Sequence, residues 1–411
     1  NITVIPNKIC GEVKAPPSKS FAHRKIICAF LSNSETVIKN VGTSADVLET
    51  VSALKEVGGN VEILDNDCYV KPCVIKHSAT IKIKESASTF RFLLPIFCAL
   101  KINAKFILGK KLMSRPNELL ISLLNANGAN IDNYEIKGEI NSGTFFLDAS
   151  VSSQFVSGLL FALPMLKEKS EIIFTKKLVS KNYVDMTISA LNEFSITPKK
   201  EKNGFTVLPS KFISKKEIFN EGDFSGASNI LALGAINGNV KVLGLNKNSL
   251  QGDKKIIDIL EKFGANVSFI NDILCVKAGK LSGIEVDVDD IIDLAPIIAT
   301  VGAFASGKTV LLGVNRLRYK ESNRLKAIVE FLTKANIKVE SKNNQLIVYG
   351  GKPQGATFNS NYDHRIEMAE VILSTFANGN SIIENAFNQK KSYTDFYKDY
   401  KSLGGEINVN I

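Results

Sequence analysis

The stretch Leu54–Val61, LKEVGGNV, ends a helix-like run and opens a strand-like one, and variants of it recur along the chain of 411 residues. The other copies are LNANGANI from Leu124, LNEFSITP from Leu191, LEKFGANV from Leu260, LTKANIKV from Leu332 and YKSLGGEI from Tyr400. The copies begin 67 to 72 positions apart, so six repeats nearly fill the chain. Because one such unit cannot bury its own apolar face, neighbouring repeats are expected to pack on each other.

The glycine in the repeated stretch is predicted to cap the helix, because a helix commonly ends in left-handed backbone that glycine adopts easily. The third copy, LNEFSITP, is degenerate and ends in proline. A chain of this length is too long for one core, which favours two domains. The polar stretch 214–223 follows three repeats and is the best candidate for a boundary. We therefore expect two similar domains with a ligand site in the crevice between them.

Composition narrows the class of protein. Apolar residues make up 45% and charged residues 22%, as in ordinary globular proteins. The apolar run 92–100 lies between Arg91 and Lys101 and is too short to span a bilayer. The six cysteines form no Cys-x-x-Cys pair and the three histidines are scattered, which favours reduced thiols and no metal site. We expect a cytoplasmic protein.

The net charge of +10 is ambiguous on its own. Nucleic acid would be compatible with it, but the chain has no tryptophan and no interleaving of aromatic with basic residues. Much of the charge lies in lysine pairs that are typical of solvated surface, such as Lys110-Lys111, Lys199-Lys200, Lys215-Lys216 and Lys254-Lys255.

Apolar spacing of three and four residues predicts the helices. They are expected at residues 21–31, 47–57, 89–100, 117–125, 153–166, 183–194, 227–236, 255–263, 295–304, 324–335, 364–377 and 395–403.

Three segments of the first half place hydroxyl groups at the start of a predicted helix, where free backbone amides can bind an anion. The sharpest is Pro17-Ser18-Lys19-Ser20, with Arg24 one helical turn further on, so that Lys19 and Arg24 could reach one oxyanion. The others are Ser152-Ser153-Gln154 and the segment 85–91, which ends in Arg91. The alternative for the first segment is an N-capped helix with a solvated basic face. For Ser152-Ser153-Gln154 it is a plain cap, which is the commoner use of such residues.

The second half contains the basic segment 316–324. Its Lys320 and Arg324 are four apart and would share a face if the segment were helical, with Glu321 beside them. An ordinary salt-bridged helix start explains this pattern nearly as well.

Asp293 interrupts the apolar run 291–296. Its carboxylate is expected to cap a helix, pair with a cation or take part in catalysis, because burying a lone carboxylate is costly. Asp363-His364-Arg365 opens another helix. Together the two halves predict a cleft for ligands that carry phosphate and carboxylate groups.

The motifs Pro17–Ser20 with Arg24, Ser152–Gln154, Arg318–Arg324 and Asp363–Arg365, in this order, closely resemble the signatures of the EPSP synthase (3-phosphoshikimate 1-carboxyvinyltransferase) family of enolpyruvyl transferases. The resemblance runs from about residue 5 to about residue 405. It implies an α/β fold, a two-domain inside-out α/β barrel of six βαβαββ-type repeats, three in each domain. One domain would be 14–221 and the other 1–13 plus 222–411, with the active site in the interdomain cleft.

The resemblance also implies the reaction. The family transfers the enolpyruvyl group of phosphoenolpyruvate to the 5-hydroxyl of shikimate 3-phosphate and releases phosphate, in the shikimate pathway of aromatic amino acid biosynthesis. Asp293 would take the hydroxyl proton, and Glu321 and Lys19 would serve the methylene carbon; which of these two moves the proton stays open. The resemblance implies no cofactor and no metal.

The binding residues are likewise implied position by position. For shikimate 3-phosphate they are Lys19, Ser20, Arg24, Ser152, Ser153, Gln154, Ser180, Asp293 and Lys320, with Tyr183 nearby. For phosphoenolpyruvate they are Lys19, Ala87, Arg91, Arg115, Gln154, Arg324, Arg365 and Lys391.

Two positions carry further expectations. Ala87 stands where the family usually has glycine, and its methyl group is expected to narrow the phosphoenolpyruvate pocket and reduce sensitivity to glyphosate. Lys19 lies in a turn and is expected to have little structural role, so its replacement should abolish turnover and leave the fold intact.

Two alternatives belong to different classes. UDP-N-acetylglucosamine 1-carboxyvinyltransferase has the same repeats and donor, but that family uses a loop cysteine, and the corresponding stretch 105–115 contains none. A repeat protein that binds RNA or another polyanion would bind with steep salt dependence and show no turnover. Our preferred interpretation is a monomer that acts on small molecules, without a nucleic-acid or membrane partner.

Overall fold

The computed structural model describes residues 1–410. They form two compact units. Unit 1 combines Asn1–Pro16 with the chain from Glu221 onward, and unit 2 is Pro17–Asn220. The chain passes from one unit to the other at Pro16–Pro17 and again at Asn220–Glu221, within the polar stretch that follows the third repeat.

Unit 2 contains three repeats. The first has α1 (Lys19–Leu31), β3 (Thr36–Lys39), α2 (Ala45–Glu56), β4 (Asn60–Leu64), β5 (Asp67–Lys71) and, from the end of the unit, β14 (Glu217–Phe219). The second has β6 (Ser78–Ile83), α3 (Ala87–Ala99), β7 (Asn103–Leu108), α4 (Lys110–Met113), α5 (Glu118–Ala126), β8 (Ile131–Asp132) and β9 (Glu135–Ile136). The third has β10 (Thr144–Asp148), α6 (Ser153–Ala162), the 3₁₀ turn η1 (Leu163–Met165), β11 (Ser170–Lys176), α7 (Lys181–Glu193), β12 (Lys199–Glu201) and β13 (Gly204–Val207).

Unit 1 contains the other three. The fourth has β2 (Ile9–Lys14), α8 (Phe224–Asn237), β15 (Gly238–Leu243), η2 (Gly252–Lys255), α9 (Ile256–Phe263), β16 (Asn266–Ile270) and β17 (Ile273–Lys277). The fifth has β18 (Glu285–Asp287), η3 (Asp289–Leu294), α10 (Ala295–Phe304), β19 (Lys308–Leu312), η4 (Val314–Tyr319), α11 (Arg324–Lys334), β20 (Val339–Lys342) and β21 (Gln345–Tyr349). The sixth has β22 (Thr357–Asn359), α12 (His364–Thr375), β23 (Ser381–Glu384), η5 (Gln389–Lys391), α13 (Phe396–Ser402), β24 (Glu406–Val409) and β1 (Ile2–Ile5).

All six repeats build the same four-stranded sheet. In the second repeat the order is β6-β7-β9-β8, with β6 parallel to β7 and the other pairs antiparallel. A helix connects the two parallel strands, as parallel pairing requires. Three strands join sheets whose other strands are distant in sequence. Strands β1 and β2 complete sheets of unit 1, and β14 completes a sheet of unit 2.

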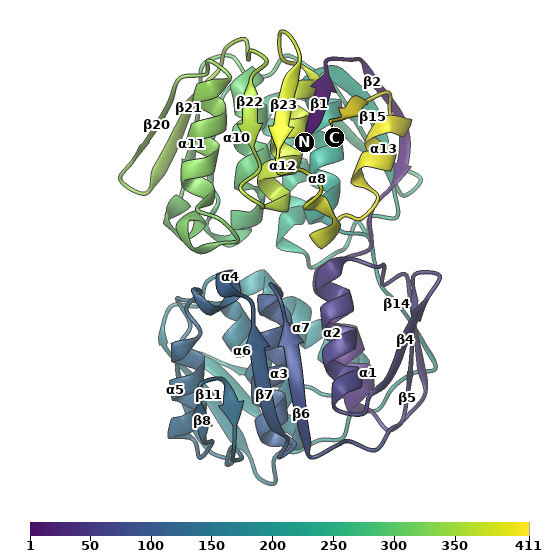
Figure 1. Cartoon of the computed structure of the whole chain (residues 1–411), viewed down its shortest axis with the longest axis vertical. Helices are drawn as coiled ribbons and strands as arrows, with labels where there is room; N and C mark the ends of the chain where they lie inside the picture. The colour runs from purple at the N-terminus through teal and green to yellow at the C-terminus, as the bar shows by residue number, and fades with distance from the viewer. Residues whose placement is uncertain (411) are drawn as a thin grey trace. The chain divides into compact units, whose positions relative to one another are not determined.

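Within each unit the crossover helices form the interior and the sheets lie outside them, as Figure 1 shows for α8, α10 and α12. Helices α3, α6, α8, α10 and α12 are buried on nearly all sides. In unit 2, α3 and α6 approach closely because Gly158 has no side chain; a Cβ there would lie 2.3 Å from the carbonyl oxygen of Arg91. This arrangement confirms the predicted inside-out α/β fold with three repeats in each half.

The predicted left-handed helix ends are present in every repeat. The four glycines have φ values of 92° at Gly58, 103° at Gly128, 106° at Gly264 and 98° at Gly404. The same conformation occurs at Ser195 and Asn336, with φ of 65° and 60°. In each copy the next residue donates its N–H to the carbonyl of the first residue, at 2.8 to 3.1 Å. This is the Schellman hydrogen bond, and it explains why one turn recurs although two copies lack glycine.

The predicted helices are confirmed to within a few residues at their ends, with one correction. The helix expected at 153–166 ends at Ala162 and continues as the 3₁₀ turn η1. Pro164 lies in that turn and has no N–H to donate, so the α-helical hydrogen bonds cannot continue.

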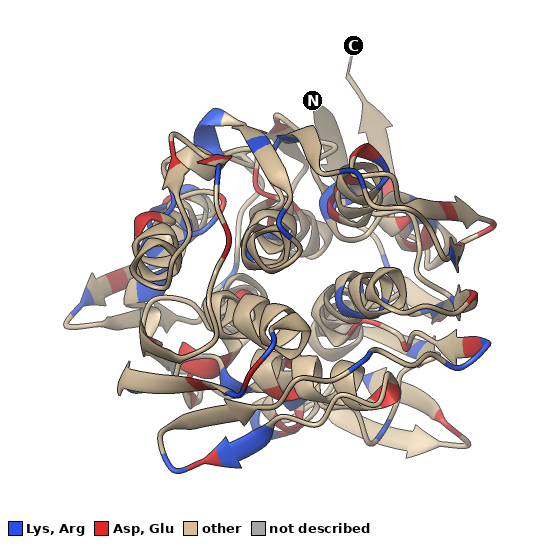
Figure 2. Ribbon diagram, turned by 90° about the horizontal axis from the view of Figure 1, so that it is seen from below, with Lys and Arg blue, Asp and Glu red and all other residues tan. Residues whose placement is uncertain are grey.

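Basic and acidic residues are interspersed on the same strands and hairpins (Figure 2). Lysine and glutamate pair across short distances on the outer strands, as at Lys199 and Glu201 or Lys338 and Glu340. Within residues 1–410, each helix is either too short or too polar to cross a membrane.

Candidate active site

Lys19 begins α1 and lies against the start of α2. Ser18 caps α1, with its Oγ accepting from the amide of Phe21 at 3.4 Å. The Nζ of Lys19 donates to Oδ2 of Asp46, in the first turn of α2, at 2.9 Å. Asp46 is buried, so this ion pair holds the two helix starts together. Lys19 is the first residue of α1 and pairs with a carboxylate far along the sequence, which predicts a structural role that was not expected for it.

A second group joins α3 to α6. The Nη1 of Arg91 donates to Oε1 of Gln154 at 2.9 Å and to Oγ of Ser152 at 3.4 Å. Its Nε donates to Oδ1 of Asn117 at 3.1 Å. Gln154 in turn donates through Nε2 to Oγ of Ser88 at 2.9 Å. The fold thus brings together three residues predicted from sequence and adds Asn117, which carried no motif signal.

Arg24 is directed into the interior of unit 2. Its guanidinium donates to Oγ1 of Thr187 at 2.8 Å and to the carbonyls of Ser20 and Tyr183 at 2.6 and 2.9 Å. It also lies over the ring of Phe92, 5.1 Å from the centroid. Burial lowers the pKa of Arg24 to about 10, which leaves it charged at neutral pH. Arg24 therefore fixes α1 to α7, and its assignment to substrate stays a prediction.

The other predicted residues of unit 2 occupy helix starts. Ser153 begins α6 and is buried, and Ser180 precedes α7 with left-handed backbone at φ 49°. Ala87 is the first residue of α3 and is buried beside Ser88. Arg115 follows α4 and is half-buried.

A buried line of hydroxyl groups, which sequence reasoning missed, connects α1, α2 and α3. The Nδ1 of His23 lies 2.7 Å from Oγ1 of Thr50, which lies 2.6 Å from Oγ1 of Thr89. Thr89 donates to Oγ of Ser86, the N-cap of α3, at 2.7 Å. Burial lowers the pKa of His23 to about 3, so its imidazole is neutral at physiological pH. His23 therefore supports these helix starts as an uncharged hydrogen-bonding group.

In unit 1, Arg324 is surrounded by carboxylates. Its side chain is 1% exposed. It pairs with both oxygens of Asp363, from Nε at 2.8 Å and from Nη2 at 3.1 Å. It also donates to Oδ1 of Asp293 at 2.8 Å and to Oε2 of Glu321 at 2.7 Å. The two acids predicted to move protons are thus held by one arginine.

Two further cations contact Asp293. The Nζ of Lys320 lies 3.2 Å from its Oδ1, and the Nη2 of Arg365 lies 3.4 Å from its Oδ2. Burial alone would raise the pKa of Asp293, but Arg365, Lys320 and Arg324 together hold it well below its ordinary value. Burial lowers the pKa of Lys320 to about 8 against the opposing charge of Asp293.

The segment of Lys320 is not helical, so the condition for a helical face shared with Arg324 is not met. Lys320 follows η4 with extended backbone, at φ −91° and ψ −156°. Asn323 accepts the amide of Lys326 at 3.1 Å and caps α11, so the helix begins only at Arg324. Lys320 and Arg324 meet because both reach Asp293, and a shared helical face is not the cause.

Asp253 and Ser225 belong to this group although neither was predicted from the sequence. The Nη2 of Arg365 donates to Oγ of Ser225 at 3.0 Å, and that hydroxyl donates to Oδ2 of Asp253. Burial, and next the charge of Asp293, raises the pKa of Asp253. The available signal was an acid in the turn Gln251-Gly252-Asp253 directly before an amphipathic helix. Lys391, on η5, is largely buried.

Comparison with known proteins assigns the family. The family model described as EPSP synthase (3-phosphoshikimate 1-carboxyvinyltransferase) matches residues 4–400. The chain belongs to the EPSP synthase family. It is 37% identical to 3-phosphoshikimate 1-carboxyvinyltransferase of Clostridium novyi, over 99% of this chain and 98% of the relative. The protein of that name from Brachyspira hyodysenteriae is 35% identical and is covered to 99% in both chains.

The fold agrees with solved EPSP synthases. The structure of the enzyme from Acinetobacter baumannii aligns with a TM-score of 0.84 at 22% sequence identity, covering 99% of both chains. At that identity the likeness supports the architecture. The function rests on the closer relatives.

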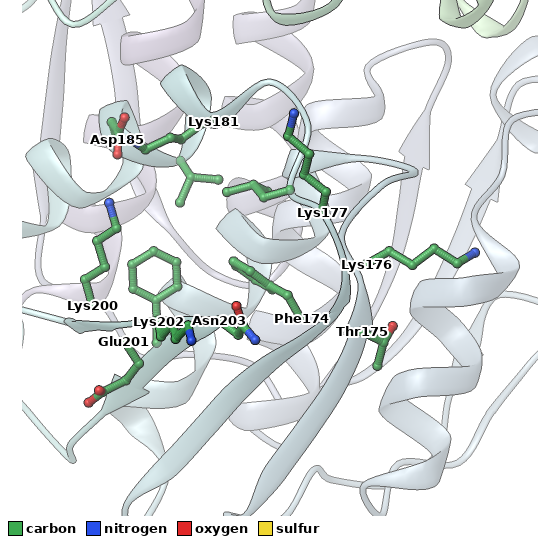
Figure 3. A pocket seen from close by; sticks show the side chains of 14 residues that line it. Phe174, Thr175, Lys176, Lys177, Lys181, Asp185, Lys200, Glu201, Lys202 and Asn203 are labelled. Atoms are coloured by element: carbon green, nitrogen blue, oxygen red, sulfur yellow. The ribbon is translucent and has the colours of Figure 1, made fainter.

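A cavity of about 400 Å³ in unit 2 is lined by Lys181, next to Ser180, but its lining within residues 1–410 contains none of the residues that the EPSP synthase family signatures assign. Residues of α7 and of the strands β11, β12 and β13 line it, including Phe174 and Phe205, and Figure 3 shows Phe174 among the lysines of its lining. Its lysines are exposed, and Lys176 is paired with Asp148 at 2.7 Å. Among the described residues, the lining of this cavity has exposed lysines and no buried polar group, so we do not assign the active site to it.

The Lys19–Asp46 pair yields a test that separates structure from catalysis. Lys19→Ala should abolish turnover and also lower the free energy of unfolding by about 1–3 kcal/mol, because the buried Asp46 carboxylate loses its cation. Lys19→Ala combined with Asp46→Asn should regain stability and remain inactive. Urea unfolding and phosphate release measure the two effects. An unchanged unfolding midpoint for Lys19→Ala would show that the ion pair has no structural role.

Proposed function

We propose that this chain transfers the enolpyruvyl group of phosphoenolpyruvate to the 5-hydroxyl of shikimate 3-phosphate and releases phosphate. The family match and the relatives that carry the name 3-phosphoshikimate 1-carboxyvinyltransferase support this reaction. The observation that carries it is the convergence of Asp293 and Glu321 on the buried Arg324, beside Lys320 and Arg365. Two acids held among cations suit a reaction in which protons move near anionic substrates.

The chemistry is an addition followed by an elimination. The hydroxyl of shikimate 3-phosphate attacks C2 of phosphoenolpyruvate while C3 gains a proton, which gives a tetrahedral adduct. Loss of the C3 proton and of phosphate then forms the enol ether. Asp293 accepts the hydroxyl proton, and Glu321 and Lys19 serve C3. No electron transfer occurs, so the reaction requires no redox cofactor, and we assign no metal.

Each substrate carries a phosphate and a carboxylate, so binding requires several cations. We assign Arg91, Arg115, Arg324, Arg365 and Lys391, with Gln154 and Ala87, to phosphoenolpyruvate. We assign Ser20, Arg24, Ser152, Ser153, Ser180 and Lys320 to shikimate 3-phosphate, with Lys19, Gln154 and Asp293. We further propose a monomeric cytoplasmic enzyme without nucleic-acid or membrane partners.

The decisive experiment follows phosphate release from phosphoenolpyruvate in the presence of shikimate 3-phosphate. We expect release that depends on both substrates and an enol ether product visible by NMR. No release would reject the proposal. Release only with UDP-N-acetylglucosamine would indicate the other carboxyvinyltransferase, and steeply salt-dependent RNA binding without turnover would indicate a polyanion-binding protein.

The low pKa of Lys320 predicts a dependence on pH. Above about pH 8 its ammonium group loses the proton, and the site loses one positive charge for the substrate anions. We therefore expect kcat/KM for shikimate 3-phosphate to fall as the pH rises through about 8. Lys320→Arg, which stays charged, should remove this alkaline limb even if its rate is lower. An alkaline limb that persists in Lys320→Arg would assign the ionisation to another group.

Ala87 predicts weak inhibition by glyphosate. The methyl group narrows the pocket at the start of α3, next to Ser88 and the Arg91–Gln154 pair. One methyl group in a binding pocket changes discrimination by roughly tenfold or more, so Ala87→Gly should lower the inhibitory concentration by that factor. Inhibition of phosphate release by glyphosate measures it, with Ala87→Ser as the control that keeps the pocket narrow. Equal sensitivity of the wild type and Ala87→Gly would contradict the prediction.

A further inference from the structure

Glu367 lies on α12, two residues after Arg365, and is fully buried. Its carboxylate faces the turn that follows β23. Oε1 accepts from the amide of Phe387 at 2.9 Å and from the hydroxyl of Tyr397 at 2.6 Å. Oε2 accepts from the amide and the side chain of Asn388 at 2.7 and 2.8 Å. Each oxygen thus receives two donors, which is how a buried carboxylate is stabilised.

The turn that Glu367 holds leads directly into Lys391. Asn385 and Phe387 have left-handed backbone, at φ 54° and 76°. This conformation is unfavourable for a bulky residue such as phenylalanine and persists only where surrounding contacts impose it. The 3₁₀ turn η5 starts at this point, since the amide of Lys391 donates to the carbonyl of Asn388 at 3.0 Å. The position of Lys391 therefore depends on the conformation that Glu367 fixes.

We propose that Glu367 is a positioning residue, whose carboxylate fixes the turn 385–391 so that Lys391 is presented to phosphoenolpyruvate. Helix α12 then determines the positions of two cations assigned to phosphoenolpyruvate. Arg365 lies on the helix itself, and Lys391 is held through the turn. Nothing in the sequence motifs pointed to Glu367. The inference rests on the proposed function for the identity of the ligand, whereas the contact between Glu367 and the turn is independent of it.

The same helix offers a matched control. Glu370 lies three residues further along α12 and is equally buried. Its Oε2 has no hydrogen-bond partner within residues 1–410. Burial, and next the charge of Glu367, raises the pKa of Glu370 well above its ordinary value, which favours the neutral form of its carboxyl group. Glutamine should therefore replace Glu370 without loss, whereas in Glu367→Gln an amide NH₂ would point at donors.

The test compares Glu367→Gln with Glu370→Gln in the full-length protein. We expect Glu367→Gln to raise KM for phosphoenolpyruvate about tenfold, with kcat and KM for shikimate 3-phosphate within about twofold of wild type. Glu370→Gln should match the wild type in all three constants. Tyr397→Phe removes the hydroxyl that donates to Glu367 and leaves the ring unchanged, so we expect a smaller rise in KM for phosphoenolpyruvate. This variant tests the proposal if Glu367→Gln does not fold.

Hydrogen exchange tests the turn without substrate. In Glu367→Gln the amides of Phe387 and Asn388 should exchange about tenfold faster than in wild type, while those of α11 stay unchanged. Unchanged exchange at these amides, or faster exchange with an unaltered KM for phosphoenolpyruvate in an active enzyme, would overturn the proposal. A wild-type protein without turnover would count against the proposed function, and the exchange rates would still decide whether Glu367 holds the turn.

Discussion

The buried guanidinium of Arg324 is the interaction on which the site in unit 1 depends. A charge that is 1% exposed is tolerated only when it is fully paired, and here three carboxylates surround it. Asp363 contributes both oxygens and also caps α12 by accepting the amide of Arg365 at 3.0 Å. One arginine thus connects the turn before α10, the start of α11 and the start of α12. The positions of Asp293 and Glu321 follow from that connection.

The fold was predictable where the signal is local. In the copies that contain glycine, the glycine four positions after the first residue predicts the left-handed helix end. The apolar spacing predicts the helices. Ser195 and Asn336 adopt the same conformation without the glycine signal, because the Schellman hydrogen bond and the buried residue that follows, Ile196 or Ile337, select it. Residues 1–13 were expected to join the second domain only from the family resemblance. Local patterns could not predict which strands pair, since pairs such as β14 with β3 join segments with no shared local pattern.

The grouping of candidate site residues was predictable where a motif combined with a recognisable helix start. Arg91, Gln154, Asp293 and Arg324 were expected, and each lies with another predicted residue of its own unit. Acids that act by holding another group were not predicted, because an isolated Asp or Glu in a sequence is compatible with any surface position. Asp46, Asp253 and Glu367 gain their roles only from the partners that folding brings to them. The pairing of Lys19 could not be predicted either, because folding brings Asp46 to it from a distant part of the chain.

The charge around Asp293 bears on how the proposed base could work. A carboxylate whose pKa lies well below the ordinary value is a weak base, although an effective general base has a pKa near the working pH. The cause is the set of cations that contact it, Arg365, Lys320 and Arg324. In the proposed reaction, substrate phosphate or carboxylate groups bound to these cations would offset their charge and raise the pKa of Asp293. Asp293 would then be a stronger base when anionic substrate is bound, which would confine proton removal to the occupied site.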